Sequence, residues 1–174
     1  GLGWSLHLAR VKYPYSQGSL PVIVMPDGSE HVVFPDQNNA NWKTQEFWKY
    51  EITTIGSNEW GIVTLTDGTQ YKFRISGTWN GQTVAGAPWY PVEEIEDVSG
   101  NRITVTNSYQ NYSGFDYSFF IDSIQDSCGR SVSFTYNVNV SNGKRLGLQS
   151  ITANSKTYAF TYEDFTDNSD RFLL

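Results

Sequence analysis

Residues 60–75, which read WGIVTLTDGTQYKFRI, decide the fold of this chain. Apolar residues precede a short polar turn, and every second residue from Tyr71 to Ile75 is apolar after it. Alternation with a period of two is typical of a half-buried β-strand. An Asp-Gly pair between two such segments is a strong hairpin signal, because glycine adopts the positive φ that tight turns need. This stretch therefore predicts two antiparallel strands joined by a turn at Asp67 and Gly68.

The same arrangement recurs along the chain, as expected for an array of repeated units. The other pairs of alternating segments span residues 22–34, 92–106, 120–136 and 148–162. Most of their turns contain an Asp-Gly or an Asp-x-x-Gly sequence, which suits a tight reversal of the chain. The turn residues that we expect to have a structural role are Asp27, Gly28, Asp67, Gly68, Asp97, Gly100, Asp126, Gly129 and Arg130.

Five hairpins in series predict an all-β fold: an antiparallel meander of consecutive hairpins that forms an open curved sheet, since one hairpin alone is marginally stable in water. Residues 36–51, which are rich in aromatic side chains, fit either a helical turn or another strand, and a strand is favoured. No linker separates two compositions, so residues 1–174 are expected to form a single unit. The segments expected to be loops are residues 16–19, 76–88, 107–114 and 137–147.

The composition agrees with this fold and excludes several classes of protein. The chain has 38 Val, Ile and Thr residues and 27 aromatic residues, but only 16 Ala, Leu and Met residues, which excludes an all-helical protein. A net charge of −6 argues against binding to nucleic acid. The single cysteine, Cys128, excludes an intrachain disulfide framework and a cysteine-based zinc site. No run of roughly 18 apolar residues is present, so no membrane span is expected.

Few residues have a pattern that suggests catalysis or metal binding. His7 and His31 are far apart and have no neighbouring ligand residue. Glu94 and Asp97 belong to an acidic cluster, and paired carboxylates are what a glycoside hydrolase requires, but a solvated strand face is the favoured interpretation. Cys128 lies in a turn without a nearby base, which favours a passive role. We therefore expect no catalytic residue and no cofactor.

The spacing of Asp164, Asp167 and Asp170 partly matches a calcium-binding loop. The segment lacks the glycine and the terminal bidentate glutamate of such a loop, so no metal site is expected there.

The aromatic residues leave one alternative open. Trp79, Trp89 and Tyr90 lie in or beside the glycine-rich segment 77–91, where exposed rings could stack on sugars. This alternative is a carbohydrate- or cell-surface-binding β module. Most other aromatic residues follow the period of two that a packed sheet face produces, and packing is favoured over sugar binding.

The recurring unit resembles the RHS/YD-repeat family. Residues 124–136 contain the turn Asp126-Ser127-Cys128-Gly129-Arg130 between an apolar and an aromatic segment, as in the repeats of that family. Residues 97–103 give a second match, and residues 1–6 resemble the segment that opens the repeat region in bacterial RHS and toxin-complex proteins. The turns at Gly28 and Gly68 depart from the pattern, because Asp and Gly are adjacent there.

The resemblance implies a structural function. RHS/YD repeats form a long sheet that spirals into a shell around a toxin or effector domain, in proteins that are secreted or lie on the cell surface. The expected partners are therefore the rest of a longer chain and an enclosed C-terminal effector. Since residues 172–174 resemble the start of another strand, the chain is expected to be a piece of a longer protein. Its unpaired sheet edges are expected to cause self-association.

Overall fold

The computed structural model of the chain describes residues 8–12, 20–35, 42–79, 82–84, 89–112, 116–138 and 145–161. These residues form β-strands, turns and connecting segments, with no helix among them. The prediction of an all-β fold is therefore confirmed. The strands are β1 (Arg10–Lys12), β2 (Val22–Val24), β3 (Glu30–Val32), β4 (Phe34–Pro35), β5 (Trp42–Lys43), β6 (Lys49–Ile55), β7 (Asn58–Thr64), β8 (Gln70–Arg74), β9 (Gly77–Trp79), β10 (Gln82–Val84), β11 (Trp89–Glu96), β12 (Arg102–Tyr112), β13 (Asp116–Asp126), β14 (Ser131–Val138), β15 (Arg145–Ala153) and β16 (Lys156–Ala159).

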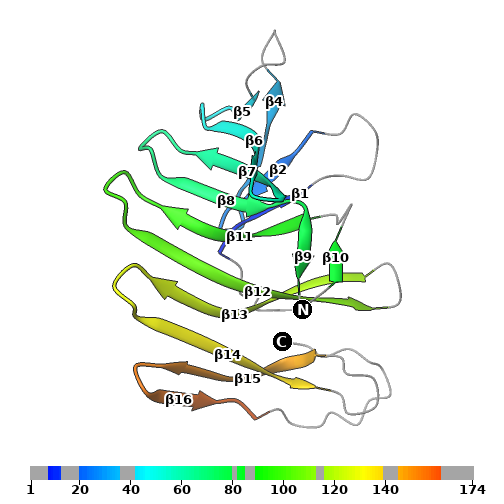
Figure 1. The fold of residues 1–174 in the computed structure, drawn as a ribbon, viewed down its shortest axis with the longest axis vertical. Coiled ribbons are helices and arrows are strands. Elements are labelled where there is room, and N and C mark those ends of the chain that lie inside the picture. Colours follow the sequence, from blue (N-terminus) through cyan, green and yellow to red (C-terminus); the bar gives the residue numbers. More distant parts are fainter. Residues whose placement is uncertain are drawn as a thin grey trace.

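Fourteen of the described strands belong to one open antiparallel sheet. Its main path runs in the order β16-β15-β14-β13-β12-β11-β8-β7-β6-β5-β4, so that most neighbours in the sheet are also neighbours in the chain. The strands stack along the long axis of the molecule, and the turns of β7–β8, β11–β12, β13–β14 and β15–β16 lie along one side of the sheet (Figure 1). The predicted meander of consecutive hairpins is confirmed.

The first three strands leave this simple order. β1 pairs with β2 and with β11, so that Arg10 lies opposite both Val24 and Pro91. β3 pairs with β2 and completes the first predicted hairpin. In the view of Figure 1, β1 and β2 lie beside the strands of the upper half of the sheet. The pairing of β1 with β11 thus joins the beginning of the described chain to a strand near its middle.

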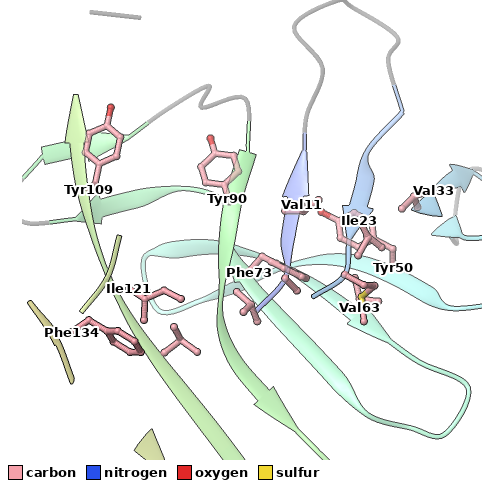
Figure 2. Packing of buried hydrophobic residues seen from close by; sticks show 14 residues of the cluster. Val11, Ile23, Val33, Tyr50, Val63, Phe73, Tyr90, Tyr109, Ile121 and Phe134 are labelled. Carbon is pink, nitrogen blue, oxygen red and sulfur yellow. The ribbon is translucent and has the colours of Figure 1, made fainter. Parts of the chain in front are cut away.

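The hydrophobic core lies where these first strands meet the sheet. Val11 and Ile23 are fully buried and belong to the same cluster as Tyr50, Val63 and Phe73 (Figure 2). The cluster continues along one face of the sheet, and its remaining members are Ala9, Met25, Val33, Tyr90, Val92, Val105, Tyr109, Ile121 and Phe134. In several strands alternate residues share this apolar face, as Tyr90 and Val92 do in β11 and as the period of two predicted.

All five predicted hairpins are present, and residues 42–43 and 49–51 of the unassigned segment form strands, as favoured. Three of the expected loops are wrong in part. Residues 77–79 and 82–84 pair as the separate hairpin β9–β10. β12 and β13 continue their ladder to Tyr112 opposite Asp116, and β14 extends to Val138. These segments are polar, but their partner strands supply the backbone hydrogen bonds that extend the ladders. Residues 16–19 lie outside the described residues.

Candidate functional site

Four of the predicted turns have the same backbone. They occupy residues 25–29, 65–69, 97–101 and 126–130, and in each the first N–H donates to the fifth carbonyl over 2.8–3.0 Å. The fourth residue is always glycine, with φ between 82° and 86°, and its N–H donates to the first carbonyl over 2.9–3.0 Å. This is a type I turn followed by a left-handed residue that forms a bulge. The glycines Gly28, Gly68, Gly100 and Gly129 therefore occupy equivalent positions.

An aspartate caps each of these four turns. In every case its Oδ1 accepts the N–H of the fifth residue, over 2.8–2.9 Å. Asp97 and Asp126 are the first residue of their turns, whereas Asp27 and Asp67 are the third. The apparent departure of the first two turns is thus a change in the position of the aspartate and leaves the backbone unchanged. Sequence spacing alone made the two kinds of turn look different.

The capping bonds hold the pKa of all four aspartates below the ordinary value of 3.8. Hydrogen bonds from Ser29, Thr69 and Asn101, the fifth residues of the first three turns, are the main cause there. At Asp126 desolvation raises the pKa, but hydrogen bonds from Arg130 outweigh it. Each carboxylate is therefore a structural acceptor that is stabilised in its ionised form.

A fifth copy of this turn lies in the segment that the sequence left open. The N–H of Thr44 donates to the carbonyl of Trp48, and that of Phe47 donates to the carbonyl of Thr44, both over 3.1 Å. Phe47 takes the place of the glycine with φ of 64°, and Thr44 Oγ1 accepts the N–H of Trp48 over 3.3 Å. Since this copy has neither an aspartate cap nor a glycine, no turn signal in the sequence identifies it.

The acidic cluster of β11 forms a network of ion pairs across three strands. Lys72 Nζ lies 2.6 Å from Glu94 Oε1 and 2.7 Å from Glu96 Oε2. Arg102 lies 3.4 Å from both carboxylates. Burial lowers the pKa of Lys72, but the hydrogen bonds with Glu94 and Glu96 raise it more, and they also lower the pKa of Glu96. Glu94 and Asp97 are thus committed to structural contacts, and a hydrolase that uses them has no support.

A cavity of about 180 Å³ lies between β1, β11, β12 and β13. Apolar side chains form most of its wall, and Val105, Phe119 and Ile121 are among them. Two polar side chains, Arg10 and Asn107, also line it. A mostly apolar cavity with a few converging polar groups is the usual form of a small-molecule site. This cavity is therefore the candidate functional site of the described residues.

Asn107 is a buried polar residue on the face of β12 that otherwise carries apolar core residues. It follows Val105 and precedes Tyr109 on the core face of β12, and only 7% of its surface is exposed. Its Nδ2 donates to the carbonyl of Val92 over 3.0 Å, which fixes the amide orientation, because the opposite one would place two oxygens together. The ladder shifts register beside it, between Thr106 and Asn107. Such bulges commonly re-aim side chains near sites.

Trp79, Trp89 and Tyr90 were considered as exposed rings that stack on sugars, and the described rings among them are not arranged in that way. Tyr90 is only 3% exposed and belongs to the core, so an exposed role for its ring is wrong. Trp89 is half-buried at the cavity, with Arg10 Cζ 5.4 Å from its ring centroid and Phe119 edge-on at 5.1 Å. Trp79 lies on β9, and its side chain is outside the described residues. Of these three residues, Trp89 is therefore the one whose described side chain lines the cavity.

His31 links two of the turns. Its Nδ1 lies 3.1 Å from Glu46 Oε2, and its Nε2 lies 2.9 Å from Ser29 Oγ. An acid, a histidine and a serine in this order resemble a hydrolytic triad. However, Ser29 Oγ is also 2.7 Å from Asp27 Oδ1, within a capped turn, and Trp48 covers the imidazole with its ring centroid at 4.2 Å. The contacts therefore serve to join the two turns.

The remaining candidate residues form no further site in the described part of the chain. Cys128 is exposed, and its N–H donates to Asp126 Oδ1 over 3.0 Å. Among the described residues, no group of three or more His, Cys, Asp or Glu side chains is placed to hold a metal ion. His7 and the aspartates 164, 167 and 170 lie outside the described ranges.

Comparisons with protein families, with curated proteins and with solved structures found no match for this chain. Within the residues that the structure describes, no helix is long and apolar enough to cross a membrane.

Proposed function

We propose that this chain is a non-catalytic structural segment of a larger repeat-built β-sheet of the RHS/YD type. The protein that contains it would be secreted or exposed on a bacterial surface, and the sheet would form part of a shell around a toxin or effector domain. One observation carries this proposal: the same capped turn recurs on four hairpins of one continuous sheet. Recurrence of one supersecondary unit is the hallmark of repeat architectures, in which each unit is stabilised by its neighbours.

Contacts between neighbouring turns support this repeat interpretation. The N–H of Ser127 donates to the carbonyl of Arg102 over 2.8 Å, which ties one turn to the strand that follows the preceding turn. The side chain of Val98 lies against Gly68, so that the turns 65–69 and 97–101 also touch. The turns 97–101 and 126–130 thus each rest on the capped turn before them, and the pattern can be extended by further hairpins.

The edge strand β16 is suited to such an extension. Among the described strands it pairs only with β15, so one side of its backbone has no strand partner there. Tyr158 is 59% exposed and Phe160, just after the strand, is 42% exposed. A sheet edge with exposed aromatic side chains is a template for another strand, because natural edges are usually protected by charge, bulges or proline. In the proposed assembly the next repeat covers this edge.

Sedimentation of the 174-residue chain over a range of concentrations tests the open edge. We expect reversible self-association that a Tyr158→Lys/Phe160→Lys variant abolishes, because charged side chains disfavour edge pairing. Thr104→Lys is the matched control, since Thr104 is exposed on β12, which pairs with β11 on one side and with β13 on the other. A monomer at all concentrations would contradict the proposal, as would association that all variants share.

A further inference from the structure

The strand β16, which ends the sheet at the opposite end from β4, has a backbone edge whose geometry follows from its ladder with β15 (Figure 1). The N–H of Phe160 donates to the carbonyl of Gln149 over 2.9 Å, so the backbone groups of Phe160 point toward β15. Successive residues of a strand point these groups to opposite sides, so those of Thr157 and Ala159 point away from β15. In the described part of the chain no strand pairs with that side of β16.

The side chains of β16 continue an apolar row that crosses the last three strands. Phe134 on β14 lies opposite Ile151 on β15, and Ile151 lies opposite Tyr158 on β16. Phe134 is 9% exposed, Ile151 is half-buried and Tyr158 is 59% exposed, so exposure rises toward the edge of the sheet. Among the described strands the row therefore stops at an aromatic ring that has an apolar neighbour on one side only.

The other end of the main path is not open in the same way. β4 follows β3 with only Val33 between them, and β3 pairs with β2. The N–H of Val33 donates to the carbonyl of Pro21 over 2.9 Å, while the next residue, Phe34, lies opposite Lys43 on β5. Because successive residues point their backbone groups to opposite sides, this end of the path is paired through β2 on one side and through β5 on the other.

We propose that a second copy of this chain pairs with β16, with the two strands antiparallel and Tyr158 of one copy opposite Tyr158 of the other. This inference rests on the open edge of the proposed function and adds a partner and a register for that edge. A twofold axis normal to the sheet relates the copies, so that both apolar faces lie on the same side. Because such an interface uses the same patch of both copies, it closes on itself and assembly stops at a dimer.

Three features of β16 select this register. Thr157 of each copy pairs with Ala159 of the other, which uses both residues of the strand whose backbone groups point outward. The two Tyr158 rings join the apolar rows of both copies into one. Lys156, the first residue of the strand, lies opposite Phe160 of the other copy, where its ammonium group can contact the face of the ring. Centring the pairs on Thr157 or Ala159 instead places one end of β16 beyond the strand of the other copy.

Disulfide cross-linking of chains with a single cysteine tests the register. Cys128, which is exposed, is first replaced by serine. In this background Tyr158→Cys places two thiols directly opposite each other, whereas Thr157→Cys and Ala159→Cys leave the two thiols two residues apart along the strands. That separation exceeds the roughly 7 Å between Cα atoms that a disulfide spans. With diamide as the oxidant, Tyr158→Cys is therefore expected to give a covalent dimer at least about tenfold faster than the two matched controls.

Sedimentation of the Cys128→Ser chain counts the copies, and association is expected to stop at two. Association beyond two copies would overturn this inference and leave the proposed function standing, as would cross-linking that is fastest at Thr157→Cys or Ala159→Cys. Equal cross-linking at all three positions would indicate parallel strands and would have the same consequence. A chain that stays monomeric would overturn both proposals, because another segment would then cover the edge.

Discussion

The main-chain N–H of Arg130 donates to Asp126 Oδ1 over 2.9 Å, while its side-chain Nε donates to Oδ2 of the same carboxylate over 2.5 Å. One aspartate thus holds both the backbone and the side chain of the residue that ends the turn. The equivalent bond to the fifth residue recurs in the turns capped by Asp27, Asp67 and Asp97. The four carboxylates therefore stabilise the same turn in four of the repeated hairpins.

The turn aspartates are expected to make the fold sensitive to acid. Their pKa values are lower in the folded chain than the ordinary 3.8, so they stabilise the fold above that pH. This contribution is lost as the pH falls from 3.8 through the folded pKa values. Replacing all four by asparagine should flatten the dependence of the unfolding free energy on pH in this window. Urea titrations at several pH values measure it.

Glu59→Gln is the control for this experiment, because Glu59 is exposed and caps none of these turns. If the unfolding free energy of the fourfold variant falls toward low pH as steeply as that of the original chain, the turn aspartates do not cause the acid sensitivity. Some acid sensitivity is expected to persist, since the pKa values of Glu30, Glu46 and Glu96 are lowered too.

Phe47→Gly is expected to stabilise the chain. Phe47 has φ of 64° and is 77% exposed, so it bears the cost of a left-handed backbone without packing in return. Glycine removes that strain but increases the entropy of the unfolded chain, which leaves a net gain of ~0.5–1 kcal/mol in the free energy of unfolding. Gly129→Ala, at the equivalent position of another turn, should lose about 1 kcal/mol. A loss of stability on Phe47→Gly would show that the phenyl ring has a packing role.

Gly61→Ala is expected to destabilise the core. A Cβ at this position would lie 2.5 Å from Tyr50 Oη and 3.0 Å from Cε2, and Tyr50 is 2% exposed, so its ring has little room to move. Overpacking of this kind typically costs ~1–3 kcal/mol. Because the closest atom is the hydroxyl oxygen, Tyr50→Phe should recover part of the loss in a double-mutant cycle. Additive losses would show that the added Cβ does not clash with the hydroxyl group of Tyr50.

Lys72→Met is expected to destabilise the sheet more at pH 7 than at pH 3. The substitution keeps the aliphatic stem but leaves Glu94 and Glu96 with only the more distant contact to Arg102, at 3.4 Å, in the described part of the chain. At neutral pH the two carboxylates then repel each other. At low pH this repulsion is relieved by protonation of Glu96, whose pKa rises toward its ordinary value once the hydrogen bond from Lys72 is gone. Lys49→Met, which breaks an exposed pair with Glu51, is the control. Equal losses at both pH values would contradict this account.

Much of the fold follows from local sequence signals, because the turns of this chain are specified within five residues. An aspartate and a glycine at the right places determine a capped turn, and alternation on either side determines the strands. The turn at residues 44–48 was missed because it lacks these two residues. Phe47 adopts the left-handed conformation there in place of glycine, and a phenylalanine does not indicate such a turn. The extra length of β12 was also missed, because it depends on pairing with β13 rather than on its own composition.

The candidate site could not be read from the sequence. Asn107 lies in a polar segment that resembles a loop, and only its pairing with β13 places it on the core face between Val105 and Tyr109. Trp89 was singled out for its ring, but its position beside Arg10 depends on the pairing of β1 with β11. The spacing of residues along the sequence predicts neither the burial of Asn107 nor the contact between Trp89 and Arg10.

Local sequence patterns were enough to predict the five hairpins and their turns, because these depend on the conformational preferences and polarity of neighbouring residues. Two features depend on long-range pairing instead: Arg10 lies opposite Pro91, and Asn107 lines a cavity. The physical reason is that such contacts join residues about half the chain apart. Their free energy comes from burial of a shared apolar face, which many alternative pairings of the same alternating strands could supply.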